Sequence, residues 1–196
     1  YYRMRNIYDN DIIHNILILA IDINVINFYR NIFSDFSLSI EIFDTDHFAM
    51  EKYISEFYHD KIDAPLALLG LKPNRMDVSV YDNNELIHYS YTSIGELDFK
   101  RELDKVLTNL ESCGYFKEIN NIFIYGESLL ESVKEYLLKK YPDKEIILLD
   151  PFDNFSIEDG IIESPEEELL KFSSASRFAP LFGAALKTRD VGEVEK

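Results

Sequence analysis

A single glycine between a buried strand and a helix has the position best suited to nucleotide chemistry. Gly126 follows the apolar run 119–125 and precedes the helix-capping pattern Ser128-Leu-Leu-Glu131. In nucleotide-binding α/β folds such a glycine lets a base or a phosphate approach the backbone. The competing interpretation is a tight strand-to-helix turn that needs a positive φ. Because the carboxylate of Glu127 would repel a phosphate, the residues favour the turn.

The short motifs that mark common catalytic or metal sites are missing from the sequence. It has no GxxxxGK[ST] or GxGxxG phosphate loop, and no HExxH, CxxC or GxSxG. Its four histidines are scattered without metal-ligand spacing. Its one cysteine, Cys113, has no adjacent histidine or basic group to activate it. We therefore predict no catalytic residue and no metal ligand.

The carboxylates do not fit the two-metal site of a ribonuclease-H-type nuclease. That site needs several carboxylates around two ions, one of them in the middle of the first strand. The strand predicted over 64–71 carries none, and Asp77 on the next strand does not replace it. The acidic run 166–168 fits negative charge at the start of a helix. A nuclease is therefore disfavoured.

The charge balance argues against two classes of partner. The formal net charge is −16 and the sequence pI is about 4.6. Such a surface repels phosphate backbones and offers no basic face to a membrane, so we expect no nucleic-acid binding. No apolar run approaches the roughly 20 residues of a transmembrane helix, so we expect no direct insertion into a membrane. The single cysteine fits a reducing cytoplasm.

Hydrophobic periodicity predicts three strands in a row, over 64–71, 76–81 and 85–91. Tight turns at Lys72-Pro73-Asn74 and Asp82-Asn83-Asn84 imply an antiparallel meander, because Pro fixes φ and Asn tolerates positive φ. Helix, strand, helix and strand then follow up to Leu149, and the intervening helices make these strands parallel. This order is that of a ribonuclease-H-like α/β fold, with a mixed sheet and flanking helices.

The preceding residues predict a βαβα unit. A buried strand over 15–21 leads through Asp22, as helix cap, to a helix that ends near Phe33. Alternation over 38–42 predicts a half-buried strand, and a helix capped by Asp44 or Thr45 follows. We divide the chain into three parts. These are a βαβα subdomain over 1–62, a ribonuclease-H-like subdomain over 63–187 that ends in a helix over 178–186, and a disordered tail over 188–196.

Three stretches resemble the type IV pilus assembly protein PilM, an actin-like family related to the cell-division protein FtsA. The resemblance covers about Asn15 to Leu186 and matches the C-terminal two-thirds of that family. The stretches are Phe-Asp-Thr-Asp-His-Phe-Ala (43–49), Ile-Tyr-Gly-Glu-Ser-Leu-Leu (124–130) followed by Leu-Asp-Pro-Phe (149–152), and Phe-Gly-Ala-Ala-Leu-Lys (182–187). Their order and spacing agree with the family. The first residue is Tyr1, not Met, so we expect a part of a longer protein.

The departures from the family concern the phosphate chemistry. Its second phosphate motif, Asp-x-Gly, corresponds here to Gly70-Leu71-Lys72. The carboxylate that would hold a magnesium-bound water is absent, and lysine replaces the glycine that lets the backbone approach the phosphates. The adenosine turn of the family, Gly-Gly, is Gly126-Glu127. The resemblance therefore implies weakened nucleotide binding.

The resemblance implies a non-catalytic actin-like scaffold of a pilus or secretion inner-membrane platform. Such a protein binds the cytoplasmic tail of a membrane partner and stays cytoplasmic, at the inner membrane only through that partner. Residues 15–58 would belong to the subdomain for partner contact. No cofactor is expected. The sequence is compatible with a homo-oligomer.

Two alternatives remain from the sequence. The first is a working actin-like ATPase that binds ATP and magnesium. There Gly126, Glu127 and Ser128 would lie nearest the base and ribose, and Lys72 would approach the phosphates and supply the missing charge. The second is the same fold without any link to a pilus.

Overall fold

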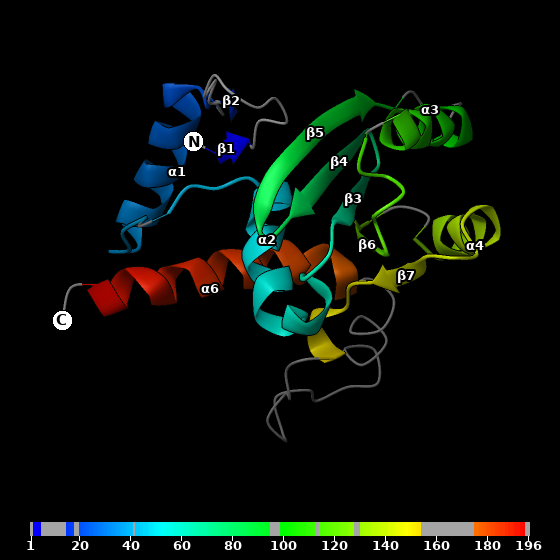
Figure 1. Cartoon of the computed structure of the whole chain (residues 1–196). Coiled ribbons are helices and arrows are strands. Elements are labelled where there is room, and N and C mark those ends of the chain that lie inside the picture. The colour runs from blue at the N-terminus through cyan, green and yellow to red at the C-terminus, as the bar shows by residue number, and fades with distance from the viewer. Residues whose placement is uncertain are drawn as a thin grey trace, which may run out of the picture.

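A seven-stranded mixed sheet forms the centre of the protein in the computed structural model (Figure 1). The structure describes residues 2–4, 15–17, 20–40, 42–94, 99–112, 114–127, 130–153 and 175–194. The strand order across the sheet is β2-β1-β5-β4-β3-β6-β7. The strands are β1 (Tyr2–Met4), β2 (Asn15–Leu17), β3 (Leu66–Lys72), β4 (Arg75–Asp82), β5 (Glu85–Ser93), β6 (Asn121–Gly126) and β7 (Glu145–Leu148).

Helices flank this sheet and connect its parallel strands. The α-helices are α1 (Ile23–Asp35), α2 (Asp46–Phe57), α3 (Phe99–Ser112), α4 (Leu130–Lys140) and α6 (Ala179–Val194). Short 3₁₀ turns are η1 (His59–Lys61), η2 (Pro151–Asp153) and η3 (Ala175–Phe178). Asp22 caps α1 as the sequence predicts, because its Oδ1 accepts a hydrogen bond from the backbone N–H of Asn24 at 2.7 Å.

The predicted meander and parallel strands are confirmed. β3 pairs antiparallel with β4, and β4 pairs antiparallel with β5. The β4–β5 turn has positive φ at both central residues, 50° at Asn83 and 60° at Asn84, which is the conformation that favours Asn in a two-residue hairpin. β6 lies parallel to β3 and to β7, with α3 and α4 as the crossover helices.

Two apolar layers hold the helices on the two faces of the sheet. On one face α3 and α4 pack through side chains such as Leu107, Leu110 and Leu137. On the other face α2 and α6 pack through Phe48, Tyr53 and others. Successive residues of β3 face opposite layers, Leu69 the α3–α4 layer and Leu68 the α2–α6 layer, and both are fully buried. This continuous burial is typical of a sheet covered on both sides.

Helices α2 and α6 approach each other closely at Gly183. A Cβ atom at this position would lie 2.0 Å from the carbonyl oxygen of Ala49, so any side chain there would force the helices apart. At the N-terminal end of α2, Lys187 forms an ion pair with Asp44 and donates a hydrogen bond to the carbonyl oxygen of Phe48 at 3.0 Å. The helix pair thus has a fixed separation near the start of α2.

Two sequence predictions are wrong. Residues 38–40 and 42 form no strand, because this segment of alternating Leu38, Ile40 and Ile42 runs beside a cavity instead of pairing with a neighbour. The expected disordered tail is helical up to Val194, since no proline interrupts α6 after Pro180. Helix α2, which we assigned to the first subdomain, packs on the sheet of the second. The subdomain boundary itself stays a prediction.

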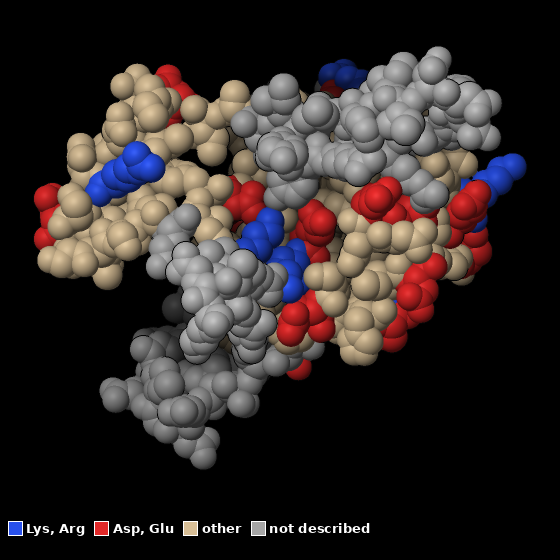
Figure 2. All heavy atoms as spheres, turned by 60° about the vertical axis from the view of Figure 1, so that its left-hand side comes forward, with Lys and Arg blue, Asp and Glu red and all other residues tan. Residues whose placement is uncertain are grey.

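Acidic residues outnumber basic ones, 36 to 20, which gives the formal net charge of −16. The space-filling view in Figure 2 shows a small group of basic side chains at the centre of one face, with acidic side chains on either side. None of the helices in the described part of the chain combines the length and apolar character that crossing a bilayer requires.

Candidate functional site

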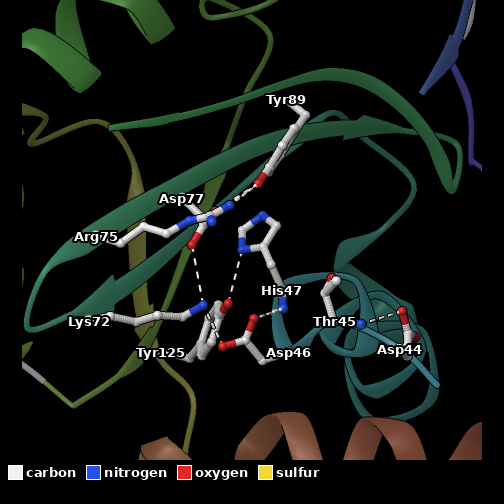
Figure 3. Close-up of polar contacts among 9 residues, drawn as sticks. All are labelled: Asp44, Thr45, Asp46, His47, Lys72, Arg75, Asp77, Tyr89 and Tyr125. Atoms are coloured by element: carbon white, nitrogen blue, oxygen red, sulfur yellow. Dashed lines mark hydrogen bonds and ion pairs between the residues drawn. The ribbon is translucent and has the colours of Figure 1, made fainter. Parts of the chain in front are cut away.

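An ion-pair cluster occupies the corner where β3 turns into β4. We call it the ionic corner and define it by Asp46, Lys72, Arg75, Asp77 and Tyr89. Lys72 ends β3, and its Nζ pairs with the carboxylate of Asp46 at the start of α2 and lies 3.4 Å from Oδ2 of Asp77 on β4 (Figure 3). One ammonium group is thus held between two carboxylates from two different elements.

Asp77 is the buried anion of this corner, with a side chain that is 1 % exposed. Its Oδ1 accepts hydrogen bonds from Nε of Arg75 at 2.9 Å and from the hydroxyl of Tyr89 at 2.8 Å. Burial alone would raise the pKa of Asp77, but the hydrogen bonds from Arg75 and Tyr89 and the nearby positive charges hold this pKa below its ordinary value. Burial and the bond to Asp77 raise the pKa of Tyr89 to about 12.

A second polar group lies beneath the ionic corner, around His47 of α2. The ring nitrogen Nδ1 lies 3.0 Å from the hydroxyl of Tyr125, and Nε2 lies 2.9 Å from Oγ of Ser79. Burial lowers the pKa of His47 to about 4, although Asp77 and Asp46 act in the opposite direction. His47 is therefore neutral near pH 7 and links α2 to β4 and β6.

Gly70 makes room for this buried group. A Cβ atom there would lie 2.6 Å from the hydroxyl oxygen of Tyr125, so the tyrosine ring fills the space beside the strand. The PilM-like motif has a carboxylate at this place in the strand. In this chain a phenol ring that is 1 % exposed lies there instead, and it is hydrogen-bonded to His47.

Gly126 has the backbone conformation of a tight turn. Its φ is +131°, and a Cβ atom would lie 2.0 Å from the carbonyl oxygen of Leu71. That oxygen accepts a hydrogen bond from the N–H of Glu127 at 2.8 Å. The N–H of Gly126 is used as well, donating to Oγ of Ser176 at 3.3 Å. The tight turn is therefore sufficient to explain why glycine occurs at position 126, and no bound ligand is needed.

Three of the four residues predicted for a nucleotide site do come together. Lys72, Gly126 and Glu127 line a cavity of about 280 Å³ beside the ionic corner, whereas Ser128 lies outside the described residues. Residues that the sequence reasoning missed complete the wall, notably Asp46 and Arg177. We call this space the corner cavity. Two cationic and two anionic side chains border it, so its own charges balance.

The sequence contains a pattern that could have indicated part of the ionic corner. Arg75, Asp77 and Ser79 alternate along β4, which places three polar side chains on one face of a buried strand. Asp46 and His47 lie inside one of the PilM-like stretches. No comparable signal marked Arg177, because it reaches the cavity only through the position of η3 at the start of α6.

A second, larger cavity lies next to the first. It measures about 890 Å³ and lies between α1, residues 39–40 and 42–45, the start of α2, and α6. We call it the apolar groove, since most of its surface is apolar. It is defined by Tyr29, Phe33, Ile40, Ile42, Phe43, Ala49, Leu181, Ala184 and Ala185. Asp46, Pro180 and Leu181 line both cavities, so the two spaces share a wall.

The described residues offer no ready metal site. Among them no group of three or more His, Cys, Asp or Glu side chains is arranged to hold a metal ion. Within the ionic corner, the ammonium group of Lys72 occupies the space between the carboxylates of Asp46 and Asp77. A magnesium ion bound by these two carboxylates would have to displace it.

Comparison with known proteins establishes the fold. The PilM structure in the PilM–PilN type IV pilus biogenesis complex matches with a TM-score of 0.55 and 14 % identity, over 76 % of this chain and 53 % of that chain. Two further structures, an actin-like protein of unknown function from Bacteroides thetaiotaomicron and the psk41 ParM protein, have TM-scores of 0.40. The chain has an actin-like ATPase fold, which confirms the predicted fold class.

Comparison at the level of sequence is less informative about function. No protein-family model matches the chain. The uncharacterized protein 218R of Invertebrate iridescent virus 6 is 24 % identical over 148 residues, which is 71 % of this chain and 50 % of that protein. The chain therefore spans about half the length of both this relative and the PilM structure.

Proposed function

We propose that this chain belongs to a non-catalytic actin-like scaffold that binds a segment of a partner protein in the apolar groove. The observation that carries the proposal is the contrast between the two cavities. The space expected to hold phosphates is bordered by two cationic and two anionic side chains, and Lys72 is already paired there with Asp46, whereas the adjoining groove is about three times as large and mostly apolar. Grooves lined by apolar side chains with a few polar groups are the usual binding sites of proteins.

The shape of the groove suits a peptide. Its lining combines the small residues Ala49, Ala184 and Ala185 with the aromatic rings of Tyr29 and Phe33. Small residues leave room for the apolar side chains of a bound helix or extended segment, and the rings offer them apolar contacts. Leu181, which is 64 % exposed at the shared wall, adds a further apolar contact.

The proposed partner is the cytoplasmic tail of a membrane protein, of the kind found in pilus or secretion platforms. Two observations support this choice, the three PilM-like stretches of the sequence and the fold likeness to a PilM that was solved in complex with PilN. The chain itself would stay in the cytoplasm and reach the inner membrane through that tail. The viral relative is an uncharacterized protein, so binding to a partner outside any pilus is the alternative outcome of the test.

A binding experiment with a groove-filling variant tests the proposal. Synthetic peptides with the cytoplasmic tails of the membrane proteins encoded beside this gene are titrated against the protein, with fluorescence anisotropy as the readout. Ala184→Trp puts a large ring into the groove and lowers the affinity of the bound tail at least about tenfold, roughly 1.4 kcal/mol. The matched control is Leu138→Trp on α4, at a side chain that is 45 % exposed and outside the groove. Equal affinity of both variants contradicts binding in the groove.

A working actin-like ATPase is the second candidate, and the corner cavity favours it. Lys72, Gly126 and Glu127 border one cavity, together with Arg177 as a second cation. Against this reading, the volume of about 280 Å³ lies just below the roughly 300–1,000 Å³ of small-molecule sites. In addition, Lys72 is already paired with Asp46, a partner that bound phosphates would have to replace.

A further inference from the structure

The connection between α1 and α2 has the sequence of a strand but pairs with no strand. Leu38, Ile40 and Ile42 are apolar and alternate with Ser39 and Glu41, which is the period of a half-buried strand. The described residues of this connection belong to none of the strands of the seven-stranded sheet. Figure 1 shows the connection as a drawn-out coil between the end of α1 and the start of α2.

Two helix ends set the course of this connection. At the end of α1, Ser37 has a φ of +58°, and the N–H of Leu38 donates a hydrogen bond to the carbonyl oxygen of Phe33 at 2.9 Å. At the start of α2, Thr45 has a φ of −90° and a ψ of 147°, which is extended backbone. The main chain between these points is therefore held at both ends by structured elements. We call Ser39, Ile40, Ile42 and Phe43, which lie between them, the open segment.

The main-chain polar groups of the open segment have no hydrogen-bond partner in the described part of the chain. This holds for the N–H and C=O groups of all four residues. A row of unpaired N–H and C=O groups is the template on which another chain adds a strand. Oγ1 of Thr45, which also lines the groove, is buried and likewise lacks a partner among the described residues. This wall of the groove therefore offers hydrogen bonds that the described residues do not use.

The open segment borders the apolar groove through its main chain. All four of its residues line the groove, although neighbouring side chains of an extended chain point in opposite directions. A lining by sequence neighbours indicates that the edge of the main chain, and not one face of side chains alone, lies along the cavity. Ala184 and Ala185 of α6 border the same cavity, and their small side chains leave room for a second main chain.

We propose that the partner segment binds in the groove as an added β-strand, paired through its main chain with the open segment. Because this mode needs a segment in the groove, it rests on the function proposed above. It specifies the ligand as an extended stretch of about four or more residues with apolar side chains at alternate positions. Main-chain pairing supplies affinity, and contacts of alternate side chains with Tyr29 and Phe33 supply selectivity. The strand pattern over 38–42 then has its pairing partner in the ligand.

An amide-to-ester scan of the bound tail tests the proposal. The probe is the synthetic tail peptide that binds the natural-length protein most tightly in the anisotropy titration. Each of its main-chain N–H groups is replaced in turn by an ester oxygen, and all side chains stay the same. In an added strand only every second N–H faces the open segment. Esters at these alternate positions lower the affinity about threefold to tenfold, and esters between them by less than about twofold.

Hydrogen–deuterium exchange of the protein gives the second measurement. Because the main-chain N–H groups of the open segment have no partner, the region 38–44 exchanges rapidly in the free protein. Pairing with the tail slows this exchange at least about tenfold. The turn at Asn83 and Asn84 is exposed and lies outside the groove, so its exchange is the control and stays unchanged.

Three results would overturn the added strand while leaving peptide binding in the groove intact. Equal affinity of all esters would mean that side chains alone hold the tail, and losses at consecutive positions would mean that the tail binds as a helix. Slow exchange of 38–44 without the tail would show that this region is already paired within its own chain. By contrast, absence of tail binding, or equal affinities of Ala184→Trp and Leu138→Trp, would contradict the proposed function and the added strand with it.

Discussion

The ionic corner and the apolar groove meet at Asp46, at the start of α2, yet they are built in opposite ways. In the corner every formal charge has an opposite charge within a few ångströms, and the central carboxylate of Asp77 is buried. The groove is lined mostly by aromatic and apolar side chains, and its volume is about 890 Å³. The same fold thus places a charged cluster and an apolar groove next to each other. The side chains, not the fold, determine which of the two regions can bind a ligand.

The helix pair that frames both cavities gives the largest expected effect. Gly183→Ala places a Cβ atom 2.0 Å from the carbonyl oxygen of Ala49, so α2 and α6 must separate. We expect a loss of roughly 3–5 kcal/mol of stability, measured by urea unfolding. Gly114→Ala is the control, because a Cβ atom there meets nothing within 4 Å. If both variants had similar stability, the close contact between α2 and α6 at Gly183 would not be required for folding.

Removing the central anion tests whether the corner is a fixed structural unit. Asp77→Ala leaves the buried side of Arg75 and the hydroxyl of Tyr89 without their acceptor. Because Arg75 is 41 % exposed and can be solvated in the variant, we expect a loss of about 2–3 kcal/mol, and the denaturant midpoint falls accordingly. Asp60→Ala at an exposed position is the comparison variant. A loss below about 1 kcal/mol would show that the corner is loose and open to a ligand.

The pH dependence of stability separates the buried histidine from the ion pairs. The pKa of His47 is about 4 in the folded protein against an ordinary 6.5, so only the unfolded chain takes up the proton between these values. Stability is therefore complete above pH 6.5 and falls by roughly 3 kcal/mol as the pH drops to about 4. The pKa of Asp77 is lowered too, so its contribution is lost only at still lower pH.

Thermal unfolding of His47→Gln between pH 7 and pH 4.5 checks this. The variant is less stable at pH 7, since the bonds to Tyr125 and Ser79 are disturbed, but its stability changes less with pH. His59→Gln, at an exposed histidine, keeps the profile of the unchanged protein. If His47→Gln retained the full acid-induced loss, another group would have to cause it.

The smallest expected effect concerns the shared wall of the two cavities. Leu181 is 64 % exposed, so Leu181→Ser changes stability by less than about 0.5 kcal/mol. It nevertheless removes an apolar contact of the groove. The affinity for the tail therefore falls about threefold to tenfold in the anisotropy titration. An affinity for the tail equal to that of the unchanged protein would contradict a contact between Leu181 and the tail.

Local sequence patterns were sufficient to predict strands β3 to β7 and the helices that pack on them, but not β1 or its pairing with β2 and β5. The alternating and continuous apolar runs, together with turn residues such as Asn83 and Asn84, specify strands and hairpins through contacts near in sequence. The strand predicted over 38–42 failed because alternation also occurs where an extended segment lines a cavity. The end of α6 was missed because the charged residues after Lys187 are compatible with a helix as well as with a coil.

The candidate site was predicted only in part. Lys72, Gly126 and Glu127 lie in sequence at the ends of strands, and parallel pairing of β3 with β6 brings those ends together. The partners that neutralise Lys72 could not be derived in the same way. Asp46 meets it through the packing of α2 on the sheet, and that contact depends on the tertiary arrangement of elements far apart in the chain.

Calorimetry with magnesium and ATP on the protein at its natural length tests the central claim most directly. The account predicts no binding tighter than about 1 mM, because Lys72 is held by Asp46 and Asp77 and the turn at Gly126 is used internally. Micromolar binding that is lost in Lys72→Ala would contradict it. The ionic corner would then be a nucleotide site whose ion pairs open for phosphates, and the chain would belong to a working actin-like ATPase.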